Sequence, residues 1–338
     1  MATIRDLANH TGFSVTTISR VLNNDPTMKV TDNTRVIILE AAAELNYTSS
    51  KPRHSYKKHA AHILVAEMMT REEQISDPYY LYLKNYVVQS CMDQGYRVSY
   101  LAEKDENYWI SEEETPDGIL AIGIFSENQI MQMRDISKNI VFVDSSPDEL
   151  QFDSVVLNFK LGVRQALDYL MEYGHRRIGF LGPTYKLDQR KRPAPEVRRK
   201  YFKEYMSEIG HYDECWMIDT MLTLEETRKQ VKKWLETGKQ RPTAFLAYNE
   251  QTAITAASVF KEAGIRVPED ISIISFNDTP LSILIEPPLT SVNVHLKSMG
   301  KEAVRLLKMR IEEPKRLPYK IVMPLTLTER SSVRDCTD

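Results

Sequence analysis

Short hydrogen-bonding side chains crowd one face of a segment near the start of the chain, within residues 14–23. The apolar residues of this segment recur at helical spacing and would form the opposite face of a short helix: Val15, Ile18, Val21 and Leu22. The polar face would then carry Thr16, Thr17, Ser19, Arg20 and Asn23. Such a face fits the major groove of DNA, where short polar side chains and arginine contact base edges. The same pattern also allows a helical hairpin that serves packing alone.

A first helix and a turn would hold this polar helix in place. The first helix would have an apolar face made of Ile4, Leu7 and Ala8. Thr3 followed by Asp6 is typical of a helix N-terminus, Gly12 suits a tight turn, and Ser14 can cap the second helix. A third helix, capped by Thr31, would contribute the apolar residues Val36, Ile37, Leu39, Ala41, Ala42 and Leu45. The pattern predicts a three-helix head with a helix-turn-helix over residues 1–47.

One run of residues in this head forms a specific signature. Its members are Ala8, Gly12, Ser14, Val15, Thr17, Ile18, Ser19, Arg20, Val21, Leu22 and Asn23. The run resembles the N-terminal signature of the LacI/GalR family of bacterial repressors, and body segments such as PDGILAIG and VPEDISIISFND resemble the same family. Within it, the sequence most closely resembles repressors of galactoside-utilisation genes. The resemblance implies a repressor of double-stranded operator DNA whose affinity is controlled by a small sugar.

The resemblance also assigns DNA contacts to individual residues. It places Val15 and Thr16 against bases, and Arg20 against a guanine or a phosphate. Phosphate contacts would come from Ser14, Thr17 and Asn23. The pair Asn46 and Tyr47 stands where the heads of this family end, and Tyr47 belongs to the expected DNA surface.

Residues 48–61, TSSKPRHSYKKHAA, have the composition of a basic, disordered linker. Many family members carry a short hinge helix here, with a leucine wedged into the minor groove. No leucine occurs between Leu45 and Leu64, and Tyr56 is the only large apolar side chain that could replace it. The basic residues Lys51, Arg53, Lys57 and Lys58 would follow the DNA backbone electrostatically.

From residue 62 onward, short apolar runs alternate with amphipathic stretches. Strand candidates cover 62–68, 96–101, 118–125, 140–144, 177–182, 243–248 and 271–276, and helix candidates cover 79–94, 126–138, 159–173, 195–209, 224–237, 250–263 and 296–312. This alternation predicts parallel sheets covered by helices, arranged as two similar lobes. The fold class expected for the chain is therefore α/β, and the resemblance implies a periplasmic-binding-protein-like body. We expect an N-terminal lobe from 62–158 with crossing segments in 291–325, and a C-terminal lobe from 159–290.

Ligands of such sheets bind beyond the carboxyl ends of the strands, which here means the cleft between the lobes. Polar residues at strand ends are Asp144, Asn249 and Asn277. The resemblance makes these residues sugar ligands and adds Arg198, whose guanidinium would fork onto hydroxyls. Tyr79 and Tyr80 could stack on a sugar ring, although either could equally be a core residue.

The effector class stays open at this point. Galactose or a galactoside is the first expectation from the resemblance. A sugar phosphate would need additional cations, which Lys186, Arg190, Lys191 and Arg192 could supply. The family also contains purine-binding regulators and one that binds a phosphocarrier protein. Whether the effector acts as an inducer or as a corepressor is equally open.

Composition limits the other function classes. The chain has 338 residues and a net charge of −3, which divides into +3 for residues 1–60 and −6 for the remainder, as expected if one end meets phosphate. Three cysteines without metal-ligand spacing fit free thiols in the cytoplasm. Common catalytic motifs are absent, so we expect no enzyme, catalytic residue, metal or cofactor. The sequence has no membrane-spanning stretch, export signal or leucine-heptad tail, which favours a cytoplasmic homodimer over a secreted sugar-binding protein.

Overall fold

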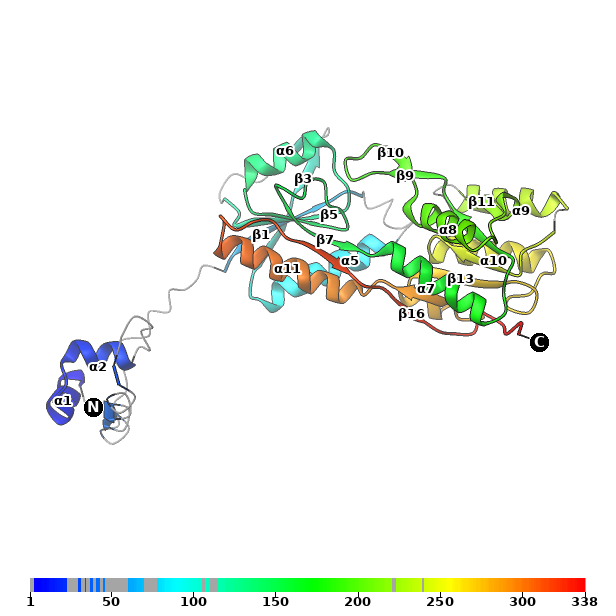
Figure 1. Ribbon diagram of the computed structural model, residues 1–338. Helices are drawn as coiled ribbons and strands as arrows, with labels where there is room; N and C mark the ends of the chain where they lie inside the picture. Colours follow the sequence, from blue (N-terminus) through cyan, green and yellow to red (C-terminus); the bar gives the residue numbers. More distant parts are fainter. Residues whose placement is uncertain are drawn as a thin grey trace. The chain divides into compact units, whose positions relative to one another are not determined.

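The structure, a computed structural model, describes residues 3–22, 30, 31, 34, 37, 38, 41, 42, 45, 60–69, 78–104, 107–109, 115–220, 223–238 and 240–337. The chain divides into two compact units, Met1–Ala60 and Ala61–Asp338. Figure 1 follows both units from the blue N-terminus to the red C-terminus. Within the described parts, no helix combines the length and apolar character that crossing a bilayer requires.

The first unit begins with α1 (Ile4–Thr11) and α2 (Val15–Leu22). A capping box starts α1: the Asp6 amide donates to Thr3 Oγ1 at 3.3 Å, and the Thr3 amide donates to Asp6 Oδ2 at 2.7 Å. Gly12 ends α1 with a φ of 73°, and its amide donates to the Ala8 carbonyl at 2.9 Å. The expected cap at Thr3 and turn at Gly12 are therefore confirmed.

Apolar side chains of the described helical residues pack into one small cluster in this unit. Its buried members are Leu7, Ile18, Val21, Ile38 and Ala41. The prediction that Val15 shares the apolar face is wrong: Val15 opens α2, one turn before the positions that pack, and is 41% exposed. The prediction that Ile37 belongs to the apolar face of the third helix is also wrong, since Ile37 is 38% exposed and its neighbour Ile38 is fully buried.

The first sheet of the larger unit is entirely parallel. Its strand order is β15 (Lys320–Met323), β7 (Asp153–Leu157), β6 (Ile140–Val143), β5 (Gly118–Ile122), β1 (His62–Glu67) and β2 (Arg97–Tyr100). One face packs against α5 (Tyr79–Asp93) and α11 (Leu296–Glu312), and the other against α6 (Glu127–Ile136). Runs such as Ile140–Val143 are buried along their whole length, as strands covered on both faces must be.

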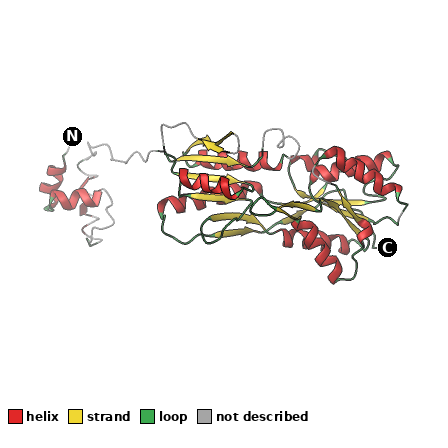
Figure 2. Ribbon diagram, turned by 90° about the horizontal axis from the view of Figure 1, so that it is seen from above, coloured by secondary structure: helices red, strands yellow, loops and turns green. Residues whose placement is uncertain are grey.

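The second sheet is parallel except at one edge. Its order is β11 (Met217–Asp219), β8 (Ile178–Gly182), β12 (Ala244–Ala247), β13 (Ser272–Asn277), β14 (Thr290–Asn293) and β16 (Thr326–Thr328), with β16 antiparallel to β14. One face packs against α7 (Phe159–Glu172) and α8 (Val197–Glu208), and the other against α9 (Leu224–Glu236) and α10 (Glu250–Glu262). Helices cover both faces of the strands in Figure 2. The predicted α/β class is confirmed.

Several smaller elements complete the body. They are the hairpin of β9 (Tyr185–Leu187) and β10 (Pro193–Pro195), the hairpin of β3 (Ala102–Lys104) and β4 (Asn107–Trp109), and the short 3-10 helices η1 (Glu214–Trp216) and η2 (Pro280–Ile283). The β9–β10 hairpin belongs to neither of the large sheets.

The chain passes between the two lobes after β7, after β14 and after β15. Each of these strands ends in one sheet, and the next element packs with the other lobe. Strand β14 lies in the second sheet and spans position 290, where the sequence-based division of the body places a lobe boundary. That division, 62–158 with 291–325 against 159–290, stays a proposal.

Candidate effector cleft and DNA-contact surface

A cavity of about 610 Å³ lies between the two lobes of the larger unit. Its lining contains all the residues expected to bind ligand: Tyr79, Tyr80, Asp144, Arg198, Asn249 and Asn277. Parallel strands explain their meeting, because β6, β12 and β13 all point their carboxyl ends toward this cleft. Tyr79 and Tyr80 come from the first turn of α5, and Arg198 from the first turn of α8.

Asp144 is the acidic group of the first lobe in this cavity. It follows β6 in the left-handed conformation, with a φ of 68°, and accepts a hydrogen bond from the Tyr80 hydroxyl at 2.9 Å. The ring of Tyr79 meets that of Tyr80 edge-on, with centroids 4.8 Å apart. Burial raises the pKa of Asp144, while the bond from Tyr80 and the charges of Lys186 and Arg198 oppose the rise. The carboxylate is thus held in place beside two aromatic rings.

Arg198 supplies a fixed cation from the second lobe. Its Nε donates to Glu196 Oε1 at 2.8 Å, and one terminal nitrogen donates to the Tyr248 carbonyl at 2.9 Å. The guanidinium carbon lies 3.8 Å from the centroid of the Tyr248 ring and 4.8 Å from that of Phe159. Arg198 is only 5% exposed. Glu196 and the Tyr248 carbonyl therefore accept two of the hydrogen bonds that the Arg198 guanidinium can donate. The guanidinium lines the cavity as a fixed cation between the rings of Tyr248 and Phe159.

The two asparagines differ in what holds them. Asn249 Oδ1 accepts from the Thr252 amide at 2.9 Å and caps α10, so this oxygen has a structural use. Asn277 ends β13 with a φ of 100° and is 6% exposed. The next residue, Asp278, accepts bonds from Asn293 and Thr328 and pairs with Arg330, so its carboxylate is held by the second lobe's own side chains.

Other lining residues were not anticipated as ligands, and among them are the ring residues Phe159 and Tyr248. Phe159 follows β7, a strand absent from the sequence prediction, and Tyr248 immediately precedes Asn249. Their positions just after strands are the sequence feature that could have identified both as lining residues. Lys186 lines the cavity, as the phosphate alternative requires, but Arg190, Lys191 and Arg192 do not line it. Arg192 instead pairs with Asp188 at 2.7 Å.

The charges around the cavity balance. The lining contains the cations Lys186, Arg198, Lys200 and Lys320, and the acids Asp144, Glu149, Asp188 and Glu196. Two of these pairs are in direct contact, Lys320 with Glu149 at 2.7 Å and Arg198 with Glu196 at 2.8 Å. The cavity therefore offers polar groups and aromatic faces without an excess of either sign.

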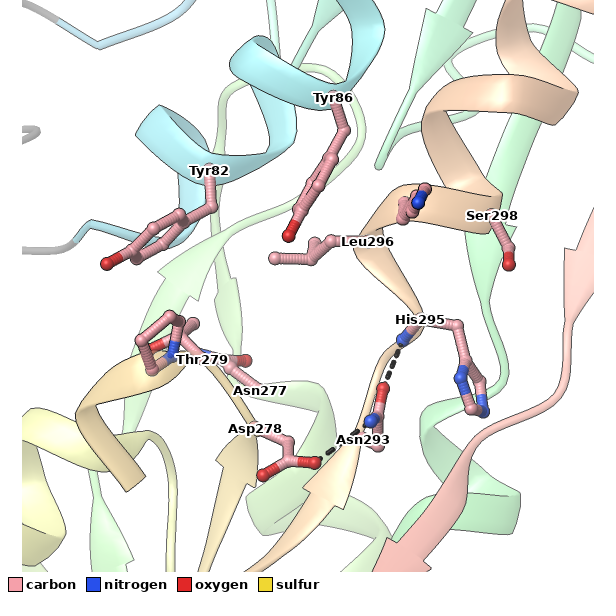
Figure 3. Close-up of a pocket in the computed structure, with 11 residues that line it drawn as sticks. Tyr82, Tyr86, Asn277, Asp278, Thr279, Asn293, His295, Leu296 and Ser298 are labelled. Atoms are coloured by element: carbon pink, nitrogen blue, oxygen red, sulfur yellow. Dashed lines mark hydrogen bonds between the residues drawn. The ribbon is translucent and has the colours of Figure 1, made fainter. Parts of the chain in front are cut away.

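A second, smaller cavity of about 230 Å³ lies beside the connection from β14 to α11, where the chain passes between the lobes. Figure 3 shows Tyr82 and Tyr86 of α5 on one side and Asp278, Asn293 and His295 on the other. Asn293 donates to Asp278 at 2.9 Å and accepts from the His295 amide at 2.7 Å. Asn277 lines both cavities, so the end of β13 separates them.

The head presents part of its expected DNA surface. Ser14, Val15 and Thr16 are exposed at the start of α2, and Thr17 and Arg20 are half-buried. The Ser14 hydroxyl accepts from the Thr17 amide at 3.1 Å, so it caps the helix as predicted. The remaining expected DNA contacts lie outside the described residues: Asn23, Tyr47, Lys51, Arg53 and Tyr56.

Comparison with known proteins agrees with this architecture. The family model "Bacterial regulatory proteins, lacI family" matches residues 3–50, and the model "Periplasmic binding protein-like domain" matches residues 167–333. The HTH-type transcriptional regulator GanR of Bacillus subtilis (strain 168) is 32% identical over 335 residues, which cover 98% of this chain and 100% of GanR. The chain belongs to the LacI family of bacterial regulatory proteins. It is a DNA-binding transcriptional regulator, and its relatives are regulators rather than enzymes.

Solved structures share the regulator's fold. A transcriptional regulator CelR–cellobiose complex aligns with a TM-score of 0.66 and 22% identity, covering 98% of this chain and 100% of CelR. The lac repressor dimer bound to operator and the anti-inducer ONPF aligns with a TM-score of 0.62 and 20% identity, covering 98% and 99%. At these identities the likeness concerns the fold, and both the head and the two-lobed body take part in it.

Proposed function

We propose that this regulator represses transcription from an operator and that a neutral sugar bound in the cleft between the lobes controls its DNA affinity. The observation that carries the proposal is the composition of the 610 Å³ cavity: carboxylate, carboxamide and guanidinium groups beside aromatic faces. Sugars need paired donors and acceptors for hydroxyls and a flat apolar surface for the ring. The cellobiose of the CelR complex shows that this fold accommodates a sugar.

The balanced charges favour a neutral sugar over a sugar phosphate. A phosphate dianion requires cations that are not already neutralised. In this cavity Arg198 is paired with Glu196 and Lys320 with Glu149. The two other lining cations, Lys186 and Lys200, are matched in number by the acids Asp144 and Asp188. Within the neutral sugars, the resemblance to repressors of galactoside-utilisation genes makes galactose or a galactoside the first candidate.

A thermal-shift panel tests the effector class. The full-length protein is melted with galactose, lactose, cellobiose, galactose 6-phosphate and hypoxanthine, because a ligand that prefers the folded state raises the melting temperature. We expect a rise with at least one neutral sugar and a smaller rise with galactose 6-phosphate. A rise with galactose 6-phosphate or hypoxanthine alone would refute the neutral-sugar proposal.

The DNA contacts are proposed from the surface of α2. Val15 and Thr16 would face bases, Arg20 a guanine or phosphate, and Ser14 and Thr17 phosphates, with Asn23 and Tyr47 extending the surface. Lys51, Arg53 and Tyr56 would follow the DNA from the linker. We infer a homodimer, since two heads at fixed spacing match two half-sites and the lac repressor in the operator complex is a dimer. Action on the bacterial chromosome places the regulator in the cytoplasm.

A further inference from the structure

The β9–β10 hairpin, an arm of the second lobe, touches the first lobe across the mouth of the cleft. The Ser146 amide, which belongs to the first lobe, donates to Oε1 of Gln189 at the tip of the hairpin, at 2.6 Å. Beside it, Arg190 lies 3.4 Å from Glu127 in the first turn of α6. In Figure 1 the hairpin extends from the second lobe toward the first.

The tip of this arm has a defined shape. Asp188 accepts bonds from the amides of Arg190 and Arg192 at 2.8 and 2.9 Å, and from Nε of Arg192 at 2.9 Å. The Asp188 amide donates to the Arg192 carbonyl at 2.7 Å, which closes the turn. The hydrogen bond from the Arg192 side chain lowers the pKa of Asp188 to about 2. These bonds set the direction in which Gln189 points.

The base of the arm is anchored to the second lobe on both sides. Thr184 donates from its hydroxyl to Asp219 at 2.7 Å, and its carbonyl accepts from the Glu196 amide at 3.1 Å. Glu196 in turn holds Arg198 and caps α8 through the Arg199 amide at 2.8 Å. A displacement of the hairpin would therefore move Glu196 and, through it, the Arg198 guanidinium that lines the cavity.

On the opposite side, the arm meets the loop that presents Asp144. Ser146 lies two residues after Asp144, whose backbone is in the left-handed region and costs energy to hold. A hydrogen bond to the Ser146 amide constrains this loop. Lys186, Leu187, Asp188 and Gln189 also line the cavity, so the arm forms one of its walls.

We propose that the β9–β10 hairpin is a latch and that Gln189 is a positioning residue: ligand enters and leaves the cleft when Gln189 releases the Ser146 amide. The proposal rests on the function proposed above for the cleft. The ion pair of Arg190 and Glu127 contributes less, because both side chains are solvent-exposed and such surface pairs are weak. The hairpin belongs to the second lobe and forms one wall of the ligand cavity, and its position also depends on the hydrogen bond to the first lobe.

Hydrogen exchange at the Ser146 amide in the full-length protein tests the contact without any ligand. Gln189→Ala removes the acceptor and is expected to speed exchange at this amide by about tenfold. Gln189→Glu keeps an acceptor oxygen and should restore protection. Gln151→Ala is a matched control, because Gln151 bonds only within the first lobe among the described residues, to Asp148 and Arg134. Unchanged exchange in Gln189→Ala overturns the latch.

Dissociation rates test the gating. With lactose and galactose as probes, Gln189→Ala should release the bound sugar about tenfold faster, and Gln189→Glu and Gln151→Ala should resemble the parent protein. Faster exchange at Ser146 with unchanged sugar release would refute gating by the hairpin. If neither sugar binds the parent protein, the galactoside proposal fails, while the exchange experiment still decides whether the latch exists.

Discussion

At the residue scale, the cleft is built from side chains that hold one another in position. Tyr80 bonds Asp144, Glu196 bonds Arg198, and Asn249 caps α10. Preorganised polar groups lower the entropy cost of binding, because the ligand does not have to order them. All non-glycine residues with left-handed backbone in the described chain lie in the cleft, the adjoining cavity or the hairpin: Asp144, Lys191, Asn277, Asp278 and His295. Such strain tends to gather at functional sites.

The carboxylate of Asp144 gives a first prediction. Asp144→Asn keeps the size of the side chain and removes its charge, so acceptor strength toward sugar hydroxyls falls while the bond from Tyr80 can persist. We expect sugar affinity to fall by about tenfold, the weight of one charge-assisted hydrogen bond. Calorimetry with lactose and galactose measures it, with Asp148→Asn, a nearby acid outside the cavity lining, as the control. Equal affinities in the two variants would remove Asp144 from the site.

The head gives a second prediction. Thr16→Ala combined with Arg20→Ala removes two proposed DNA contacts from α2 and should weaken operator binding by about tenfold to hundredfold. Asn9→Ala, an exposed position on α1, is the control. Band-shift titrations on operator and on unrelated DNA measure the change. Parent-like affinity in the double variant would place the reading surface elsewhere.

Glu250 gives a third prediction, on pH. It is 3% exposed and accepts from the Thr279 amide at 2.5 Å, the Thr279 hydroxyl at 2.9 Å and the Ser282 hydroxyl at 2.7 Å. Burial raises the pKa of Glu250 to about 7, although these bonds oppose the rise. The folded protein therefore binds more protons than the unfolded chain, and its free energy of unfolding falls as pH rises from about 4.5 to about 7.

The size expected for this loss is about 1–3 kcal/mol. Urea unfolding at pH 5 and pH 8 measures it, and Glu250→Gln should remove that part of the pH dependence. Glu269→Gln, at an exposed position, is the control. A pH dependence in Glu250→Gln as steep as in the parent protein would contradict the assignment.

At the element scale, the angle between α1 and α2 depends on one turn. Gly12 has a φ of 73°, and a Cβ built there would meet nothing within 4 Å, so any cost of a side chain is backbone strain alone. The turn shows how a single position can set the direction of the DNA-reading helix. The same logic applies to the hairpin arm, where Asp188 organises the turn that aims Gln189.

This gives a fourth prediction. Gly12→Ala should destabilise the head by about 1 kcal/mol, because L-residues pay roughly that amount in the left-handed region. Gly12→Asn should cost less, since asparagine tolerates this conformation. Operator affinity and the melting of the head by circular dichroism measure the ranking. Equal behaviour of the alanine and asparagine variants would show that strain at this turn is not limiting.

At the scale of the whole molecule, the proposed control of DNA binding is a coupling between two sites. If the sugar prefers one lobe arrangement and the operator another, each ligand must change the affinity of the other by the same factor. The sign of the coupling free energy distinguishes an inducer from a corepressor, and the equality of the two factors holds in both cases.

This gives a fifth prediction. Sugar affinity measured with and without saturating operator should differ by the factor by which the sugar changes operator affinity, about 5- to 150-fold. Calorimetry with lactose or galactose and fluorescence anisotropy with labelled operator provide the two numbers. The allosteric proposal would be refuted if the two ligands changed each other's affinity by different factors, or if operator left the sugar affinity unchanged.

The sequence by itself predicts many of the elements of this protein, because their signals are local. Helical periodicity, the cap at Thr3 and the glycine at position 12 predicted α1 and its turn, because these signals act within a few residues. Alternating apolar runs predicted the parallel sheets, and strand ends predicted Asp144, Asn249 and Asn277 as neighbours in space. The physical reason is that parallel strands bring their carboxyl ends to one edge wherever they stand in the sequence.

Tertiary structure alone decided the rest. The sequence prediction did not include the strands β7, β14, β15 and β16, which are identified by their pairing within the two sheets. The neutral charge of the cavity depends on which cation meets which acid, as when Lys320 reaches Glu149 across 171 positions of the chain. The contact between Gln189 and Ser146 spans 43 positions and two lobes. Local pattern cannot specify such pairs, because they exist only after the chain has crossed between the lobes and brought distant loops together.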